Sequence, residues 1–166
     1  MNEFKFFSGL NVLITGASSG IGLAASYMFL EQGFEVYGID LDPSDIQNEH
    51  YHHYIADIRD SAQLPDLPVI HILINNAGKQ NSGDDLGHNL VGSMNVTEKY
   101  ALHNRFIRSV LFNASASAHT GFEFGEYSAS KAGLIGYMKH CAWRLAKVHA
   151  TCNSISCGGV HTALND

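Results

Sequence analysis

The sequence has no long hydrophobic run, and its first residues do not show the pattern of a secretory leader. No apolar stretch approaches the roughly 18 residues that a membrane-spanning helix needs, and the longest strand-like run is Val69–Ile74. The N-terminus does not have the basic-then-apolar pattern of a signal peptide. These absences predict a soluble, cytoplasmic protein without a membrane partner.

Cysteine is scarce, and no pattern of zinc ligands is present. The three cysteines, Cys141, Cys152 and Cys157, are an odd number and form no C-x-x-C motif, so we expect reduced thiols. The histidines at 50, 52 and 53 cluster, but without a Cys or a carboxylate at the spacing of a zinc site. We therefore predict no metal site and interpret the histidine cluster as part of a solvated loop.

Positive charge is also low. Ten Lys and Arg residues against sixteen Asp and Glu residues give a formal net charge of −6, which disfavours nucleic acid as a partner. Hydrophobic residues make up 45% of the chain and charged residues 16%, which is enough apolar side chain for a core. A length of 166 residues predicts one domain over 1–166.

Short apolar runs alternate with helical patterns along the chain. The predicted strands are Asn11–Thr15, Glu35–Ile39, Tyr54–Ala56, Val69–Ile74, Ser109–Asn113 and Thr151–Ser156. The predicted helices are Gly20–Gln32, with Gly33 as a C-cap, Asn89–Leu102 and Tyr127–Val148. This alternation predicts an α/β fold, a Rossmann-like doubly wound parallel sheet with helices on both faces. Ligands of such sheets bind beyond the carboxyl ends of the strands.

A glycine-rich segment follows the first predicted strand and opens the first helix. It reads Thr15-Gly16-Ala17-Ser18-Ser19-Gly20-Ile21-Gly22. Glycine permits a tight turn and a close approach of backbone to a pyrophosphate, and the helix N-terminus offers free N–H groups and the positive end of its dipole. We therefore predict dinucleotide contacts from Gly16, Ser18, Ser19, Gly20, Ile21 and Gly22. An ordinary glycine-rich turn is the alternative.

The carboxylate that ends the second strand favours NAD over NADP. Asp40 lies 18 residues beyond Gly22, where it can accept hydrogen bonds from the adenosine ribose and repel a 2′-phosphate. Leu41 follows it, and no Lys or Arg lies nearby for that phosphate. The alternative is that Asp40 caps the start of a loop. Asp57 and Ile58 follow the third strand, where Asp57 accepts from the adenine amino group or forms an Asx-turn.

A tyrosine and a lysine are spaced by four residues at the start of the last helix. Tyr127 and Lys131 therefore project from one helical face. A neighbouring ammonium and a cationic nicotinamide ring favour the phenolate and should lower the pKa of Tyr127, making it a proton donor and acceptor for an alcohol/carbonyl pair. Ser115 could donate a hydrogen bond to the substrate oxygen and hold that oxygen against Tyr127. A simple surface pair is the alternative.

These motifs resemble those of the short-chain dehydrogenase/reductase family, in the branch with T-G-x-x-x-G-x-G and Y-x-x-x-K. The matching stretches are Thr15–Gly22, Asp57, Asn75–Gly78, Asn89–Gly92, Tyr127–Lys131 and Gly158–Thr162, in the family's order. Members similar to 3-oxoacyl-carrier-protein reductases are the nearest in character. The resemblance implies a Rossmann-type fold and an oxidoreductase that uses a nicotinamide cofactor.

The resemblance also implies residue roles. Ser115, Tyr127 and Lys131 would be the catalytic trio, with Tyr127 and Lys131 also contacting the cofactor. Asn89 would hold a helix irregularity and a water that completes a proton relay from Lys131. The remaining cofactor contacts would come from Asn76, Ala77, Gly78, Val160 and Thr162.

The chain departs from the family pattern at four places. Ser115 lies 12 residues before Tyr127 instead of 13, with Ala114 at the usual position and Ser117 as a weaker candidate. Only ten residues separate Gly78 from Asn89, and Cys157 stands where the family has proline. The substrate-covering lobe that follows in the family is absent after Asp166, and we expect segments to be missing from the sequence.

The leading hypothesis is an NAD-dependent oxidoreductase that interconverts a secondary alcohol and a ketone. The alternatives are a non-catalytic dinucleotide-binding regulator and, behind it, an epimerase or dehydratase with the same Tyr–Lys chemistry. The partners expected are a small-molecule substrate and further copies of the chain. The helices Asn89–Leu102 and Tyr127–Val148 would pair in a homodimer or homotetramer, with Phe106, Met138 and Trp143 as candidate apolar contacts.

Overall fold

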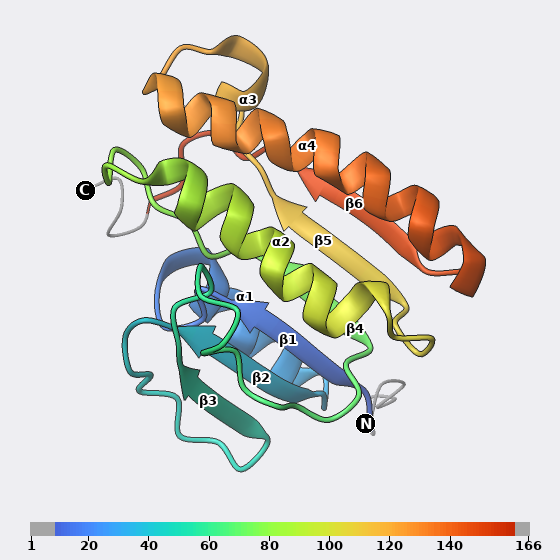
Figure 1. Cartoon of the computed structure of the whole chain (residues 1–166). Helices are drawn as coiled ribbons and strands as arrows, with labels where there is room; N and C mark the ends of the chain where they lie inside the picture. Colours follow the sequence, from blue (N-terminus) through green and yellow to red (C-terminus); the bar gives the residue numbers. More distant parts are fainter. Residues whose placement is uncertain (1–8, 162–166) are drawn as a thin grey trace.

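The computed structural model describes residues 9–161, which form a parallel sheet with helices on both of its faces (Figure 1). The six strands are β1 (Asn11–Thr15), β2 (Glu35–Asp40), β3 (Tyr51–Ile55), β4 (Ile72–Asn75), β5 (Ser109–Asn113) and β6 (Thr151–Ile155). They lie in the order β3-β2-β1-β4-β5-β6, and every neighbouring pair is parallel. This is the Rossmann-like, doubly wound sheet that the sequence predicts.

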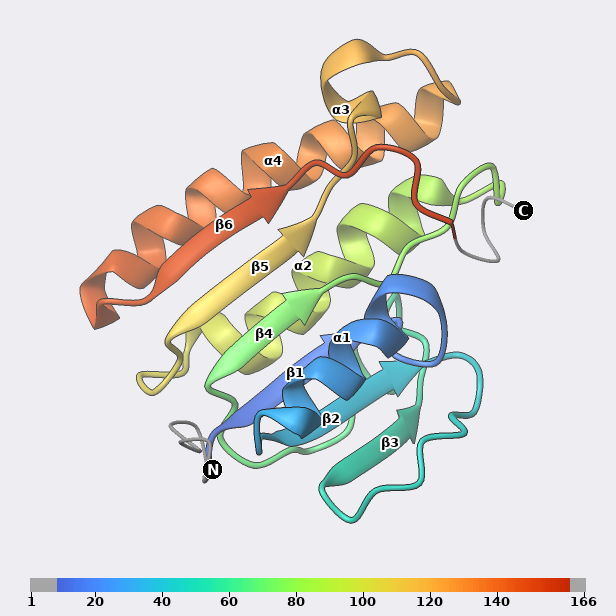
Figure 2. The ribbon, with the colours of Figure 1, turned by 180° about the vertical axis from the view of Figure 1, so that it is seen from behind.

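The helices divide between the two faces. They are α1 (Gly20–Glu31), η1 (Leu86–Val91), α2 (Gly92–Thr97), η2 (Glu98–Leu102), α3 (Ser117–Thr120), α4 (Gly125–Leu145) and η3 (Ala146–Val148). The views from the two sides show α1 on one face and α2 and α4 together on the other (Figures 1 and 2). Among the described residues, no helix is both long and apolar enough to cross a membrane.

Alternating side chains of β1 build two hydrophobic cores, one on each face of the sheet. Val12 and Ile14 pack with Phe34 on the side of α1, whereas Leu13 points to the opposite face. All three β1 residues are fully buried, as expected for a central strand covered on both sides. In register, Ile14 lies between Gly38 of β2 and Ile74 of β4.

Two strands begin at a different residue than predicted, and the predicted ends of β2, β3, β4 and β6 are each off by one residue. The third strand, predicted to begin at Tyr54, begins at Tyr51, because His52 stacks on Tyr37 at 4.8 Å and its Nε2 lies 2.9 Å from Glu35 Oε2. The fourth strand begins at Ile72, since Val69 lies on the lead-in, where its carbonyl accepts from the Asn11 side chain. The histidine cluster thus lies largely on a strand.

The predicted helix over Asn89–Leu102 begins earlier and is irregular. It starts at Leu86 and runs as two π-helical segments, η1 and η2, around the α-helical segment α2. Buried Asp85 precedes it and accepts from the backbone N–H groups of Asn81 and Ser82, so a carboxylate ties the preceding loop to the helix start. The last helix also begins early, at Gly125, and its final residues, Ala146–Val148, are 3-10.

Candidate active site

A cleft of about 660 Å³ lies at the carboxyl edge of the sheet, where the strand order reverses between β1 and β4. Most of the predicted site residues line it: Gly16, Ser19, Gly20, Ile21, Asp40, Asp57, Ile58, Asn76, Ala77, Gly78, Ser115, Tyr127, Lys131 and Val160. Ser18, Gly22 and Asn89 are not among the residues that line it, and Thr162 lies outside the described residues. The volume lies within the range of small-molecule and cofactor sites.

The glycine loop brings the start of α1 close to the sheet. Gly16 has φ of 68°, and a Cβ placed there would lie 2.8 Å from Ala77 Cα. A Cβ at Gly22 would lie 1.9 Å from the Gly16 carbonyl oxygen. Any side chain at Gly22 would therefore push α1 away from the loop, so glycine is required here for packing.

The N-terminus of α1 is open for an anion. Ser19 is the N-cap with extended backbone, and within the described chain its hydroxyl makes no capping bond. The first N–H groups of a helix have no partner inside the helix, so those of α1 face the cleft beside Gly20 and Ile21. Together with the close approach at Gly16, this end fits a diphosphate.

Asp40 closes one end of the cleft and also shapes its wall. Its Oδ2 accepts from the Ser18 backbone N–H at 2.8 Å, and its Oδ1 accepts from the Leu41 N–H at 2.7 Å. The loop-capping alternative is therefore present in the structure. The same carboxylate lines the cleft, where it remains within reach of a ligand.

The carboxylate of Asp57 is engaged by the chain itself. It accepts from the Arg59 backbone N–H at 3.0 Å, an Asx-turn, and forms an ion pair with the Arg59 guanidinium at 2.6 Å. The guanidinium also bridges to Asp84 at 2.8 Å. These hydrogen bonds from Arg59, opposed by partial burial, lower the pKa of Asp57.

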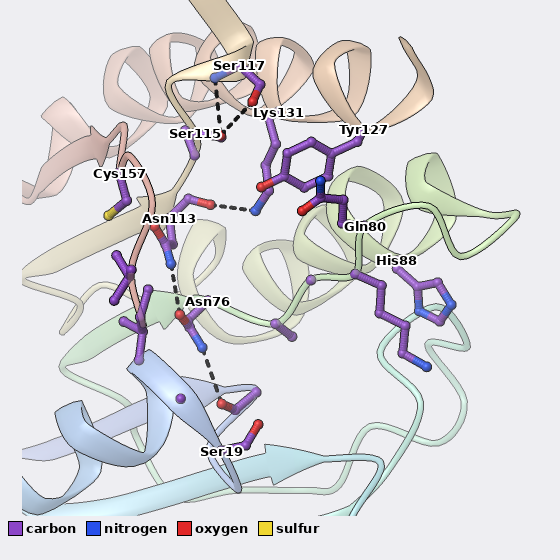
Figure 3. Close-up of a pocket in the computed structure, with 18 of the residues that line it drawn as sticks. Ser19, Asn76, Gln80, His88, Asn113, Ser115, Ser117, Tyr127, Lys131 and Cys157 are labelled. Carbon is purple, nitrogen blue, oxygen red and sulfur yellow. Dashed lines mark hydrogen bonds between the residues drawn. The ribbon is translucent and has the colours of Figure 1, made fainter. Parts of the chain in front are cut away.

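Tyr127, Lys131 and Ser115 come together at the other end of the cleft (Figure 3). Lys131 is 5% exposed, and its Nζ donates to the backbone carbonyl of Asn113 at 2.8 Å. Burial lowers its pKa to about 8. The Lys131 Nζ lies 5.7 Å from the centre of the Tyr127 ring, so the i, i+4 spacing does place both groups on one side.

The environment of Tyr127 differs from the expectation. Burial raises the pKa of Tyr127, the negative charges of Glu123 and Asp85 raise it further, and the Ser115 hydroxyl opposes the shift. The predicted lowering by Lys131 is not among these effects, because burial lowers the pKa of Lys131 to about 8, so that the amine loses its charge before the phenol ionises. In the protein alone, the phenol is thus the favoured form.

Asn89 lies in the π-helical segment η1, so the irregularity coincides with it. Its side chain accepts from the Lys79 N–H at 2.7 Å and donates to the Lys79 carbonyl and to Ser130 Oγ. Gly78 separates it from Lys131: a Cβ there would meet Asn89 Oδ1 at 2.8 Å and Lys131 Nζ at 3.2 Å. Asn89 therefore packs beside Lys131 and anchors the loop after β4.

Two asparagines, Asn76 and Asn113, connect the two ends of the cleft through hydrogen bonds, which the sequence did not predict. Asn113 Nδ2 donates to Asn76 Oδ1 at 2.9 Å, and Asn76 Nδ2 donates to the Gly16 carbonyl at 3.2 Å. The Asn113 Oδ1 is buried and has no partner among the described residues, although Asn113 lines the cleft. Such an orphaned acceptor fits a ligand that brings a donor. The signal available in the sequence was polar residues at the ends of adjacent strands.

The loop after β6 forms the last wall. The Ala116 N–H donates to the Cys157 carbonyl at 2.8 Å, which holds this loop to the one after β5. Cys157, Gly158 and Gly159 line the cleft, so cysteine in place of the family's proline leaves the wall intact. Both candidate serines, Ser115 and Ser117, also line it.

Comparisons with known proteins identify the family of the chain. The family model of short chain dehydrogenases matches residues 10–166. The short chain dehydrogenase ausX of Aspergillus calidoustus is 32% identical over 176 residues, covering 90% of this chain and 68% of that protein. A 2,3-dihydro-2,3-dihydroxybenzoate dehydrogenase of Bacillus subtilis is 26% identical, covering 95% of this chain and 72% of that protein.

Solved structures share the fold. A 4-hydroxyisoleucine dehydrogenase in complex with NADH is 26% identical with a TM-score of 0.85, covering 95% of this chain and 76% of that chain. A ligand-free aldohexose dehydrogenase of Thermoplasma acidophilum, at 23% identity and a TM-score of 0.84, covers 98% of this chain and 71% of that one.

Proposed function

The chain belongs to the short-chain dehydrogenase family, and on that premise we propose that it is an oxidoreductase that interconverts a secondary alcohol and a ketone. One observation carries the proposal. A single cleft has the open N-terminus of α1 and Asp40 at one end and Tyr127, Lys131 and Ser115 at the other. A dinucleotide bound along it would have its diphosphate at α1 and its nicotinamide at Tyr127.

The side chains then divide the chemistry. A bound nicotinamide supplies or accepts the hydride. Tyr127 gives its phenolic proton to the carbonyl oxygen as that oxygen becomes an alcohol, and takes the proton back in the oxidation. Ser115 binds the same oxygen, and the buried Lys131 supplies positive charge below the phenol ring.

We propose NAD as the cofactor. The Asp40 carboxylate lines the adenosine end of the cleft, where it would accept from ribose hydroxyls and repel a 2′-phosphate. The NADH bound to 4-hydroxyisoleucine dehydrogenase supports the class of cofactor. The substrates to test first are simple ketones and 3-oxoacyl thioesters, because the resemblance to 3-oxoacyl-carrier-protein reductases suggests the latter.

We also propose a cytoplasmic homodimer or homotetramer that pairs α4 and the helix over residues 86–102 with their copies in the partner. Trp143 on α4 is 69% exposed and Phe106 is 48% exposed, whereas Met138 packs against the core. Light scattering tests this assembly, and a monomer would contradict it.

The test of the function combines binding and turnover. NADH fluorescence should report binding, and NADH oxidation should accompany the reduction of at least one ketone or 3-oxoacyl thioester. Binding without turnover across the whole panel would favour the regulatory module. No binding of either dinucleotide would remove the proposal.

A further inference from the structure

One histidine of the cluster on β3 is bonded to the part of the chain that borders the cleft. His53 Nε2 lies 2.9 Å from the backbone carbonyl oxygen of Asp42, in the loop of residues 41–50 that joins β2 to β3. Asp42 lines the cleft together with Asp40, at the end proposed for the adenosine of a dinucleotide. Figure 1 shows β3 at the edge of the sheet, next to β2. His53 thus connects the edge strand to the rim of the cleft.

The carbonyl of Asp42 is held from two sides. The Ser18 hydroxyl donates to the same oxygen at 2.9 Å. The backbone N–H of Ser18 donates to Asp40 Oδ2 at 2.8 Å. The glycine loop and β3 therefore hold the loop of residues 41–50 at one shared acceptor, and the serine that helps to hold this acceptor also holds the carboxylate of Asp40.

The hydrogen-bond partners of His53 fix which of its ring nitrogens carries the proton. A carbonyl oxygen only accepts, so Nε2 must carry the hydrogen that bonds to Asp42. In the neutral ring Nδ1 is then an acceptor, and the Tyr51 hydroxyl, 3.1 Å away, donates to it. The two rings also stack, with centroids 6.0 Å apart and planes 23° apart. Both ring nitrogens thus have a partner, and the orientation of the ring is set.

The pleat of the sheet makes room for this arrangement. Tyr51 and His53 lie two residues apart on β3 and so project from the same face. Gly38 of β2 lies opposite His53 in register, and a Cβ at Gly38 would lie 2.3 Å from the Tyr51 hydroxyl oxygen. His52 projects from the other face, where its Nε2 pairs with Glu35. The neighbouring histidine is therefore a natural control.

We propose that His53 is a positioning residue for the cofactor: its Nε2–H holds the Asp42 carbonyl, and together with Ser18 it keeps the carboxylate of Asp40 in place for the adenosine ribose. His53 is not among the described residues that line the cleft, so it acts through the loop. The inference rests on the proposed function for the identity of the ligand. The anchoring of the loop stands on the hydrogen bonds of the chain.

Two variants of His53 and one control separate this anchoring from a general effect on β3. The side-chain amide of His53→Gln extends as far as Nε2 and can donate to the Asp42 carbonyl. The amide of His53→Asn extends only as far as Nδ1, so the bond to Asp42 is lost. His52→Asn makes the same change at the neighbouring position, where the bond to Glu35 is lost instead.

The first readout is the affinity for NADH, measured by fluorescence titration of the whole chain. We expect Kd to rise by about fivefold in His53→Asn, the effect of one lost hydrogen bond. The Kd should stay within about twofold of the wild type in His53→Gln and in His52→Asn. Where turnover is measured, His53→Asn should raise KM for NADH and leave kcat within about twofold, because the Tyr127 end is untouched. Wild-type affinity in His53→Asn, or an equal loss in His53→Gln or His52→Asn, would show that the positioning role is wrong.

The second readout needs no cofactor. In protein labelled with 15N at histidine, at a pH about two units above the ordinary pKa of histidine, long-range 1H–15N NMR should show the His53 proton on Nε2, assigned by the signal that is lost in His53→Gln. Amide hydrogen exchange over residues 40–46 should be several-fold faster in His53→Asn than in His52→Asn. A proton on Nδ1, or equal exchange in the two variants, would overturn the anchoring.

These outcomes separate the inference from the function. A wild type that binds no dinucleotide but shows the expected proton on Nε2 and the expected exchange would remove the proposed function and leave the anchoring of the loop. Equal NADH affinity in the wild type and in His53→Asn would overturn the role of His53 alone.

Discussion

The two ends of the cleft are built from different parts of the chain. The α1 end is formed mainly by backbone. Gly16 and Gly22 allow the loop and the helix to pack closely, and the first turn of α1 presents N–H groups. At the α4 end, the site consists of side chains, with Lys131 and Ser115 buried beside Tyr127. The α1 end depends on the absence of side chains at its glycines. The α4 end depends on the hydroxyl, phenol and amine groups of its side chains.

The difference predicts how each end responds to substitution. Adding atoms should harm the α1 end, because its shape is the functional property. Removing single atoms should harm the α4 end, because proton transfer and charge depend on particular groups. The asparagine pair, Asn76 and Asn113, joins the two ends.

The largest effect is expected from Tyr127→Phe at the α4 end. Loss of the phenolic oxygen removes the acid and base, so turnover should fall by about a thousandfold, while NADH affinity stays within about twofold because the phosphate end is untouched. Steady-state assays and NADH fluorescence measure the two quantities. Near-normal turnover of Tyr127→Phe would contradict the claim that the α4 end acts through its functional groups.

The next effect is expected from Lys131→Met. Turnover should fall by about a hundredfold because the positive charge below the ring is lost. Stability at pH 7 should rise by about 1 to 3 kcal/mol, because burial of the charged Lys131 destabilises the fold.

The gain in stability expected for Lys131→Met depends on pH. The folded protein has a Lys131 pKa of about 8, below the value of about 10.4 for a free lysine. Below the folded pKa, the ammonium is charged in both states and the penalty is complete. As the pH rises through the folded value toward the free one, the folded protein releases the proton first and the penalty disappears. Urea unfolding at pH 7 and pH 10 should show the advantage of the variant shrinking; an advantage that grows would contradict this.

Gly22→Ala tests the α1 end by adding one carbon. Because that carbon would lie 1.9 Å from the Gly16 oxygen, α1 must move, and we expect NADH affinity to fall roughly tenfold and stability to fall by about 1 to 3 kcal/mol. Gly136→Ala is the control, since Gly136 lies on exposed α4 with nothing within 4 Å of its Cβ position. That change should stabilise the protein by about 0.5 to 1 kcal/mol. Equal effects at the two glycines would refute the close-approach argument.

The smallest effect is expected from Asp40→Ala. Removal of the carboxylate should reduce the preference for NAD over NADP several-fold, with the larger change in KM for NADP. The Ser18 N–H loses its acceptor as well, so NAD binding should also weaken slightly. An enzyme that already prefers NADP would contradict the assignment of Asp40.

The sequence predicted the sheet and the glycine loop well because both follow local rules. Apolar runs identify buried strands such as β1, and the spacing of Gly16, Gly20 and Gly22 identifies the turn. The predicted start of β3 was wrong because His52, which pairs with Glu35, carries no strand signal. The predicted start of β4 was wrong because the apolar residues Val69 and Ile70 lie on the lead-in to the strand.

The hydrogen bonds of the α4 end were harder to predict. The pair Tyr127 and Lys131 is visible in the sequence, but the acceptor of the Lys131 ammonium is a backbone carbonyl on β5, which no residue type indicates. The Ser115 hydroxyl donates to Ser117, and the Ser117 hydroxyl donates to Glu123 across the turn at Gly121. Long-range hydrogen bonds of this kind arise from tertiary packing.

The most direct test of the central claim is a crystal structure of the complex with NADH. The account predicts the diphosphate against the first turn of α1, the adenosine ribose within hydrogen-bond distance of Asp40, and the nicotinamide ring beside the Tyr127 hydroxyl. A nucleotide bound with its nicotinamide remote from Tyr127, or bound outside the cleft, would contradict it.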